Sequence, residues 1–234
     1  MPSMFEIYEK HAAEYDELVD AEDFQGNLHD HILQVVDWDR KSVIEAGTGT
    51  GRVTRIYADR ASAVTCFDQS QHMLDRAAGR LSKSAAPITF RVADNMHMPQ
   101  VSPKCDIFIE GWSWGHSIID APGSVESVTE TLIQGARSNL VRNGEIVLIE
   151  TMGTNTPEPT PPHTRLARFY ELLVSTCSFH QDVVRTDYRF PTADVAIRVM
   201  GFFFGPEMEQ SLKNSMLTEI PEWTGVWHRS MSEI

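Results

Sequence analysis

The sequence predicts an α/β fold in which helices cover both faces of a mostly parallel sheet of seven strands, with the last strand antiparallel. Two observations support this fold class. Short apolar runs alternate along the chain with segments whose apolar residues recur every three to four positions, a rhythm typical of parallel strands joined by crossover helices. A glycine-rich loop, GTGTG at residues 47–51, directly follows the first apolar run. Such a loop lets the chain turn sharply from a strand into a helix.

Two amphipathic segments at the start of the chain predict a helical N-terminal cap over residues 1–40. Residues 5–19 space their apolar side chains at helical intervals, and residues 28–38 repeat the pattern. We expect this cap to act as a lid over the carboxyl ends of the strands, where open α/β sheets bind ligands. Tyr8 and Tyr15 would then cover the cleft.

Residues 41–152 contain five of the predicted strands and form the expected core of the fold. The strands cover residues 42–45, 63–67, 88–92, 105–110 and 145–150. Helices are expected between them: one follows the glycine loop, a second has Ser70 as its N-cap, and a long one spans residues 125–140. Right-handed crossovers would join the strands.

The remainder, residues 153–234, is predicted to complete the sheet and to form one wall of a pocket. A proline-rich loop is followed by a helix at 164–177, a strand at 182–190, helices at 193–203 and 207–216, and a last strand at 222–229. Trp223 and Trp227 are candidate pocket residues, although alternation along a strand places half of such residues in the core. No internal repeat is visible, so residues 1–234 are interpreted as a single domain.

The charge balance argues against two classes of partner. The 234 residues include 33 acids and 20 Lys plus Arg, which gives a formal net charge of −13. Because nucleic-acid affinity depends largely on Lys and Arg that neutralise phosphates, we expect no nucleic-acid partner. An anionic membrane surface would also repel the chain, so no membrane partner is expected. A monomer or a homodimer is expected.

The cysteines and the N-terminus indicate a cytoplasmic protein without a metal site. Cys66, Cys105 and Cys177 are far apart and fit no zinc-binding spacing. The N-terminus is polar and acidic, unlike a signal or transit peptide, and no run is long enough to span a bilayer. The HDH run at residues 29–31 could suggest a metal ion, but its two histidines would point to different sides of a helix.

Three classes of ligand-binding loop use glycines after a strand. A P-loop requires a lysine after its last glycine, and none is present. A dinucleotide loop has the spacing GxGxxG, whereas Gly47, Gly49 and Gly51 give GxGxG and Arg52 stands where the third dinucleotide glycine would be. Arg52 would crowd the helix–strand contact that this glycine permits. The third class of loop binds S-adenosylmethionine (SAM).

Five motifs in order make the chain resemble the class I, Rossmann-like SAM-dependent methyltransferases, in particular those that act on small molecules. The family's first motif, an apolar strand, an acid and GxGxG, is matched by residues 43–51. The next three motifs are acids at strand ends or starts, matched by Asp68, Asp94 and Asp106. The last is a glycine turn into a strand, matched at Gly144. The resemblance covers residues 5–150 well and the remainder weakly.

The resemblance implies which residues hold the amino-acid end of SAM. The three glycines of the loop would bring the backbone close to this end, and Glu45 would face the ammonium group. Glu110 lies where the family passes the methionine part of the cofactor, and Tyr15 would close over it. Two alternatives remain: Glu45 could bond the backbone amides of the loop, and Tyr15 could be a packing residue on an apolar helical face.

The resemblance also implies the residues around the ribose and adenine. Asp68 would accept hydrogen bonds from both ribose hydroxyls, because a carboxylate has lone pairs for two donors. Gln69 would flank the adenine, Asp94 would accept its amino group, and Asn95 and Met96 would complete the adenine pocket. Asp68 and Asp94 could instead be polar strand ends or helix caps.

The acceptor region is expected where the fourth strand ends. This stretch, EGWSWGH at residues 110–116, lacks the (Asp/Asn/Ser)-Pro-Pro-(Tyr/Phe) motif of families that methylate base nitrogens. Trp112 and Trp114, with Tyr8, are candidate substrate-binding residues for a flat, apolar or cationic small molecule, and we expect at least one indole to pack in the core. His116 is the candidate catalytic base, with a helix cap or surface group as its alternative.

The predicted activity is transfer of a methyl group from SAM to a small-molecule acceptor by in-line displacement, in which the protein positions the acceptor and excludes water. A nicotinamide-dependent Rossmann oxidoreductase is one alternative, and Arg52 and Asp94 argue against it. A SAM-binding protein without catalytic activity is the other. The cofactor expected is SAM, with no metal ion.

Overall fold

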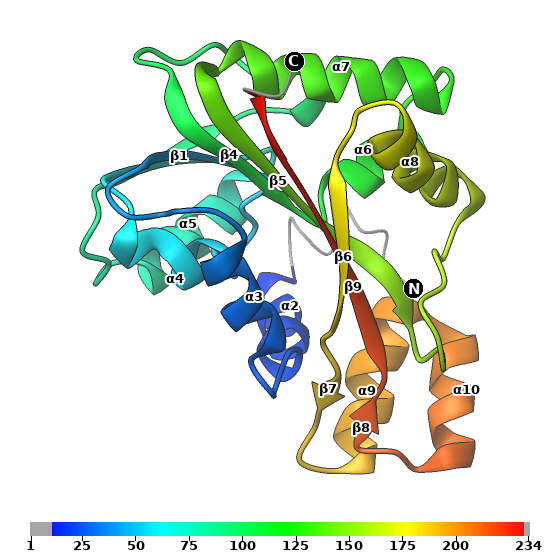
Figure 1. The fold of residues 1–234 in the computed structure, drawn as a ribbon. Coiled ribbons are helices and arrows are strands. Elements are labelled where there is room, and N and C mark those ends of the chain that lie inside the picture. Colours follow the sequence, from blue (N-terminus) through cyan, green and yellow to red (C-terminus); the bar gives the residue numbers. More distant parts are fainter. Residues whose placement is uncertain (1–10, 232–234) are drawn as a thin grey trace.

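A computed structural model describes residues 11–231 of the chain (Figure 1). Its main feature is a seven-stranded sheet in which β9 is antiparallel to both of its neighbours, β5 and β6, and the other neighbouring strands are parallel. The predicted fold class is therefore confirmed. In spatial order the strands are β3 (Ile88–Val92), β2 (Ala63–Asp68), β1 (Ser42–Ala46), β4 (Cys105–Gly111), β5 (Leu140–Thr154), β9 (Glu222–Ser230) and β6 (His180–Arg185).

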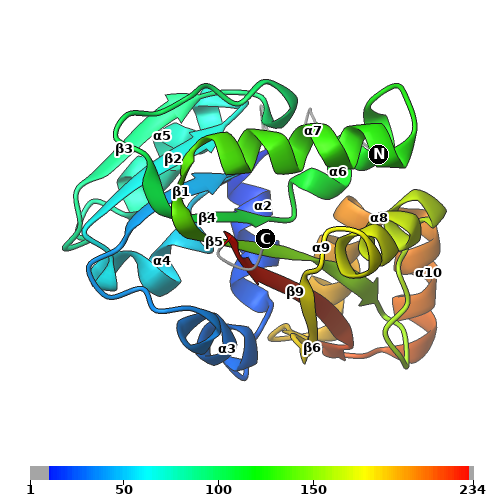
Figure 2. The same ribbon diagram turned by 45° about the horizontal axis from the view of Figure 1, so that its top comes forward.

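The two faces of the sheet carry separate apolar cores, because successive side chains along a strand point to opposite faces. In β1, Val43 belongs to the core under α3 (Asn27–Val35) and α4 (Thr54–Tyr57). Ile44 belongs to the opposite core, which is covered by α6 (Trp114–Asp120), α7 (Val125–Ser138) and α8 (Thr164–Ser175). Figure 2 shows α7 on one side of the sheet and α3 on the other. The central strands are buried on both faces, as parallel strands require.

The helix boundaries follow the capping residues. The Oγ atom of Ser70 accepts the Met73 N–H at the start of α5 (Gln71–Arg80), as the sequence predicts. Ser124 caps α7 in the same way, with its Oγ accepting the Ser127 N–H. The helix after the glycine loop is shorter than a full crossover helix, because α4 ends at Tyr57 and passes into a 3₁₀ turn over Ala58–Arg60.

A third apolar core lies beside the sheet and joins α2 (Ala12–Ala21) to residues 188–220. It combines Leu18 of α2 with residues of α9 (Ala193–Phe204) and α10 (Pro206–Ser215). The strands β7 (Tyr188–Arg189) and β8 (Glu219–Ile220) pair beside them. Figure 1 shows α9 and α10 at the end of β9 that is remote from α7.

The single strand predicted at residues 182–190 is instead divided into β6 and β7. The interruption falls at Asp187, whose carboxylate pairs with Arg185 and accepts the Glu222 N–H at 3.0 Å. These bonds bend the chain away from the large sheet and toward β8. Among residues 11–231, no helix is both long enough and apolar enough to cross a membrane.

Helix α2 is held over the carboxyl ends of the parallel strands. Asp16 forms ion pairs with Arg76 and Arg80 of α5. At the end of α2, Glu22 pairs with Arg52, whose Nη1 lies 2.9 Å from Glu22 Oε2. The described part of the predicted N-terminal cap is therefore attached to the core through the helix that follows β2 and through the glycine loop.

Candidate active site

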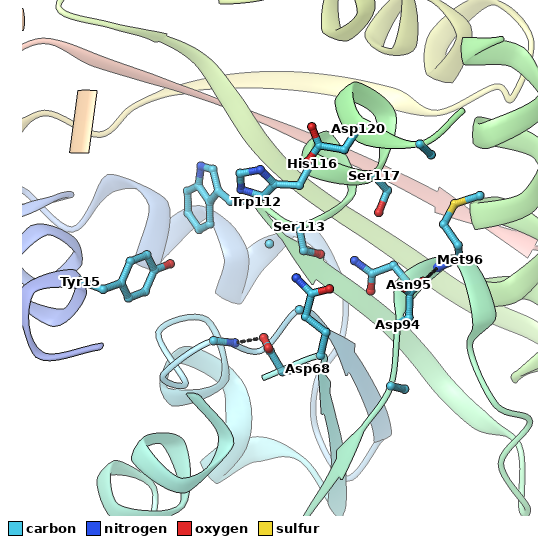
Figure 3. Close-up of a pocket in the computed structure, with 16 residues that line it drawn as sticks. Tyr15, Asp68, Asp94, Asn95, Met96, Trp112, Ser113, His116, Ser117 and Asp120 are labelled. Atoms are coloured by element: carbon cyan, nitrogen blue, oxygen red, sulfur yellow. Dashed lines mark hydrogen bonds between the residues drawn. The ribbon is translucent and has the colours of Figure 1, made fainter. Parts of the chain in front are cut away.

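A cavity of about 290 Å³ lies at the carboxyl ends of β1, β2 and β4, beneath Tyr15 of α2. Figure 3 shows Asp68 and Asp94 facing Trp112, His116 and Asp120 across it. The structure brings most of the predicted site residues to this one cavity. The predicted residues that line it are Tyr15, Gly47, Gly49, Asp68, Gln69, Asp94, Asn95, Met96, Trp112 and His116.

Two glycines of the loop are required by the positions they occupy. Gly47 has φ +64°, and a Cβ there would lie 2.1 Å from the Cβ of Ser113, so any side chain would collide with the start of α6. Gly49 has φ +56°, and its Cβ would point toward the ring of Tyr15, 3.9 Å away. The missing side chain at Gly49 leaves space between the loop and α2, at the cavity wall.

Gly51 does not line the cavity, although the sequence places it in the cofactor loop. It has φ +85°, and a Cβ would lie 2.8 Å from Cδ1 of Leu81. Gly51 therefore allows the loop to pack on the segment after α5. Its effect on the cavity is exerted through the backbone path of the loop.

Asp68 ends β2 and forms the acidic floor of the cavity. Its Oδ2 accepts the Gly49 N–H at 2.8 Å and its Oδ1 accepts the Ser70 N–H at 2.8 Å. Burial raises the pKa of the Asp68 carboxyl, while these two backbone bonds favour the ionised form. Each oxygen retains a lone pair for a further donor, so the carboxylate can bind a ligand while it holds the glycine loop.

Asp94 follows β3 and has a capping role in addition to its place at the cavity. Its Oδ1 accepts the Met96 N–H at 2.6 Å, at the start of the 3₁₀ turn Asn95–His97. One carboxylate oxygen of Asp94 thus acts as a cap, as the alternative interpretation expects, and the residue also lines the cavity. The turn that it caps presents Asn95 and Met96 on the same wall.

Glu45 lies away from the cavity, in contrast to the prediction that it faces a ligand. Alternation along β1 points its side chain to the α4 face of the sheet, where the carboxylate accepts the hydroxyl hydrogen of Tyr57. Only 1% of Glu45 is exposed. Burial raises the pKa of this carboxyl to about 7. Glu45 is therefore a buried structural group under α4.

Glu110 also lies outside the cavity and is fully buried beneath the start of α6. Its Oε2 accepts the backbone N–H groups of Ser113 and Trp114, both at 3.1 Å, and the Ser113 hydroxyl at 2.9 Å. Glu150 of β5 accepts the next backbone N–H, that of Gly115. Burial raises the pKa of Glu110 to about 7. Burial and the charge of Glu110 raise that of Glu150 well above its ordinary value.

The two carboxyl groups Glu110 and Glu150 therefore position α6 from below. They satisfy backbone N–H groups at a helix start that has no intrahelical partner for them. Sequence reasoning missed Glu150, because it lies 35 residues from Gly115 in the chain. Its only sequence signal is an acid at the end of a strand otherwise composed of apolar residues, 146–149.

The two tryptophans of the strand-four turn occupy different environments. Trp112 lines the cavity and has φ +53°, an unusual backbone conformation for a large side chain. The Arg52 guanidinium lies over its indole, 3.9 Å from the ring centroid. Trp114 is 1% exposed and packs against Phe108 in the core, so the prediction that it binds substrate is wrong. The expectation that at least one indole enters the core is confirmed.

The C-terminal tryptophans do not line this cavity either. Trp227 is fully buried beside Tyr170 on the α8 face of the sheet. Trp223 donates its Nε1–H to the Thr156 carbonyl, and Arg185 lies over its ring. Tyr8, the remaining predicted substrate-binding residue, lies outside the described residues.

His116 lies on α6 and faces the cavity (Figure 3). Burial lowers the pKa of its imidazole below the ordinary value, and the nearby charge of Asp120 opposes this shift in part. The neutral ring is therefore the dominant form at neutral pH. In this form one ring nitrogen can accept a proton.

Sequence reasoning missed three polar cavity residues, Ser113, Ser117 and Asp120. Together with His116 they follow the spacing i, i+3, i+4 and i+7, which places all four on one face at the start and along the length of α6. We call these four residues the α6 stripe. The helical spacing of polar residues within an otherwise apolar, glycine-containing segment was the signal that could have identified them.

Tyr15 lies at the mouth of the cavity, on α2. Its ring contacts Phe203 of α9 edge to face, with 6.3 Å between the centroids. Burial raises the pKa of its phenol to about 12, so the hydroxyl stays protonated. Tyr15 therefore packs on α9, as its interpretation as a packing residue expects, and it also lines the cavity.

The comparison with protein families decides between the predicted classes. Residues 43–144 match the family model described as a methyltransferase domain. This segment is therefore similar to a methyltransferase domain. It contains β1 to the beginning of β5, the glycine loop and the α6 stripe. The match confirms the resemblance that the five motifs indicate and, with it, the prediction of an enzyme that uses SAM. The nicotinamide-dependent alternative is not supported.

Solved structures share the same fold at low sequence identity. The DhpI structure, a complex with SAH, has a TM-score of 0.58 at 16% identity and covers 95% of this chain and 93% of its own. A Bacillus halodurans protein provisionally assigned as a methyltransferase has a TM-score of 0.57 at 14% identity and covers 87% and 98%. A Pyrococcus horikoshii protein provisionally assigned as an RNA methyltransferase has 0.51 at 12% and covers 87% and 81%. No curated protein sequence matches the chain.

Proposed function

We propose that the protein transfers a methyl group from SAM to a small-molecule acceptor held against the α6 stripe. The observation that carries this proposal is the composition of a single cavity. One side is formed by the glycine loop, Asp68 and the turn after β3, and the other by polar residues of α6 and the indole of Trp112. The cofactor half and the acceptor half therefore meet in one space beneath Tyr15.

The residues of the cofactor half fit SAM. When bound, this cofactor supplies a methyl group activated by its sulfonium charge. Asp68 would accept the ribose hydroxyls through the lone pairs that its two backbone bonds leave available. Gln69, Asn95 and Met96 would surround the adenine. The space left by the missing side chain of Gly49 lies between the loop and Tyr15, where the amino-acid end would be held.

The charge of the cavity supports a neutral or cationic acceptor. Its described lining includes the carboxylates of Asp68, Asp94 and Asp120 and contains no lysine or arginine. A phosphate-rich acceptor would meet repulsion and no neutralising partner there. This favours a small molecule over a nucleic acid. A flat or cationic group could rest against the indole of Trp112.

His116 is the best-placed proton acceptor for the acceptor's nucleophilic atom. Its imidazole lines the cavity and is neutral at neutral pH, because burial lowers its pKa. Asp120, four residues later on α6, would stabilise the ring after it accepts a proton. The remaining contribution is positioning for in-line displacement and exclusion of water, for which Tyr15 and α2 form the cover.

Ligand binding and methyl transfer test the proposal separately. SAM and its demethylated product should raise the melting temperature, while NAD(H) should not. Labelled SAM should then transfer its methyl group to a component of a small-metabolite extract. Label that enters only RNA or DNA would contradict the small-molecule proposal. Stabilisation by SAM without transfer to any fraction would instead support a non-catalytic SAM-binding protein.

Three further expectations complete the proposed function. We place the protein in the cytoplasm, which the free cysteines Cys66, Cys105 and Cys177 support. We expect a monomer or a homodimer, which light scattering of the purified chain would distinguish. We also retain the division into a cap at 1–40, a SAM-binding core at 41–152 and a pocket wall at 153–234, although the cavity residues described come from the first two segments.

A further inference from the structure

We propose that the protein binds a divalent transition-metal ion, with zinc as the best fit, at a site on the sheet edge that is separate from the methyl-transfer cavity. The candidate ligands are His31, His180, Asp182 and His228. None of them lines the cavity described above. They come from α3, β6 and β9, so a bound ion would connect the N-terminal cap to the last two strands of the sheet.

The strand geometry brings three of these side chains to one face. His180 and His228 are direct register partners on the antiparallel strands β6 and β9, and their rings lie with centroids 5.0 Å apart. Asp182 follows His180 by two residues and therefore points to the same face. The ligand atoms of these three residues all lie within 4.8 Å of one another.

His31 approaches the same carboxylate from the helix that covers this face. Its Nε2 lies 3.3 Å from Asp182 Oδ2. This Nε2 atom is buried and makes no hydrogen bond within the described part of the chain. His29, two residues earlier, pairs instead with Asp30. The two histidines of the HDH run thus point in different directions, and only His31 faces the other candidate ligands.

The distances from Asp182 to the three imidazoles approach those between neighbouring ligand atoms of a tetrahedral ion. Zinc bonds of about 2.0 to 2.2 Å place neighbouring ligand atoms of a tetrahedron about 3.3 to 3.6 Å apart. The Nε2 atom of His31 lies 3.3 Å from Asp182 Oδ2 and that of His180 lies 3.3 Å from Asp182 Oδ1. The Nε2 atom of His228 lies 3.9 Å from Asp182 Oδ2. Three imidazoles with one carboxylate form a donor set that zinc, copper, nickel and cobalt ions prefer.

The site is open enough for an ion to enter from solution. The side chain of His180 is 66% exposed, while those of His31 and His228 are each 29% exposed. Because the ligands belong to three elements, binding would oppose separation of α3 from β6 and β9. The bound ion would therefore stabilise the folded state in addition to any effect on catalysis.

Cobalt titration of the metal-free, untagged chain tests the site directly. We expect one Co²⁺ per chain, with the visible absorption of tetrahedral coordination and without thiolate bands, and displacement by Zn²⁺. His180→Ala and His228→Ala should weaken binding by at least about tenfold, as should Asp182→Asn. His29→Ala and His72→Ala are matched histidine controls and should bind as the native chain does. Circular dichroism and affinity for demethylated SAM should be unchanged in every variant that is compared.

Two results would overturn the metal site. The first is the absence of saturable Co²⁺ and Zn²⁺ binding by the native chain. The second is binding that persists in the folded His180→Ala/His228→Ala double variant. The role of α3 has its own measurement: Zn²⁺ should raise the melting temperature of the native chain more than that of His31→Ala, and equal shifts would remove His31 from the ligand set.

Discussion

Arg52, the residue after the glycine loop, contacts both the N-terminal cap and a tryptophan of the cavity wall. Its side chain is 11% exposed, pairs with Glu22 and lies over Trp112. Arg52→Met would leave Glu22 as a buried charge without its cation. We expect a loss of about 3–5 kcal/mol in the free energy of unfolding, measured by urea denaturation.

Arg55→Met provides the matched control for Arg52→Met. Arg55 lies three residues later and pairs with Asp20, but the two side chains are 46% and 49% exposed. Solvent screens such a pair, so this change should cost at most about 1 kcal/mol. The double variant Arg52→Met/Glu22→Gln should recover part of the loss of the single variant. Equal losses for Arg52→Met and Arg55→Met would contradict the proposed role of burial.

Asp68 carries the second prediction at the residue scale. Asp68→Ala should weaken SAM binding by about 1–3 kcal/mol, because it removes charge-assisted bonds to the ribose hydroxyls and a backbone bond that holds Gly49. Isothermal titration with SAM measures the change. Asp120→Ala alters a carboxylate of the same cavity at the acceptor end and should leave SAM affinity unchanged. Equal effects of the two substitutions on SAM affinity would contradict the proposed division of the cavity into a cofactor half and an acceptor half.

Helix α6 carries the side chains that we propose to act on the acceptor. Its start is held by Glu110 and Glu150, and its polar stripe lines the half of the cavity that we propose for the acceptor. If His116 is the base, kcat/KM should fall on the acidic side as the ring becomes protonated. Because burial lowers the pKa of His116, the midpoint should lie below the ordinary value of 6.5.

His116→Asn should remove this acidic limb and lower kcat by about 10²–10⁴-fold. The rate is followed with labelled SAM and the acceptor identified from the metabolite extract. His72→Asn is the control, because His72 is exposed on α5 and lies outside the cavity lining. An acidic limb that persists in His116→Asn would assign the titration to another group.

Across the whole molecule, the features that the sequence predicted correctly are those that depend on local sequence patterns. The apolar runs and the glycine loop predicted the sheet and its strand ends, because a strand and the loop that follows it are each formed by consecutive residues. The positions of Glu45 and Trp114 were wrong, because which face of a strand or turn meets the cavity depends on packing. In β1 alternation turns Glu45 toward Tyr57, and at the turn Trp112 faces the cavity while Trp114 enters the core.

Contacts between distant segments were beyond sequence reasoning. Glu150 reaches α6 from a different strand, and His31 meets Asp182 although 151 residues separate them in the chain. Neither pair has a local spacing that could reveal it. The α6 stripe could have been predicted from the sequence, because its four polar residues recur at helical intervals. The glycines and tryptophans of that segment instead favoured the interpretation of a turn.

The buried carboxyl groups predict how the stability of the whole molecule depends on pH. Burial raises the pKa values of Glu45 and Glu110 to about 7 and those of Glu150 and Glu222 well above the ordinary 4.5. Below these folded pKa values the four groups are neutral in the fold, whereas in the unfolded chain they release protons above about pH 4.5. Their contribution to stability is therefore complete below that pH and is lost as the pH rises through their folded pKa values.

The free energy of unfolding should consequently decrease between about pH 5 and about pH 8. His116 acts in the opposite direction, because its lowered pKa contributes stability above 6.5, but it is one group against four. Each acid contributes up to about 1.4 kcal/mol per pH unit, so Glu150→Gln should make the urea-measured slope shallower by up to that amount. Glu130→Gln, at an exposed position on α7, should leave the slope unchanged. A native slope that rises through this range would show that the buried carboxyls are ionised in the fold, with cations or water compensating their charge.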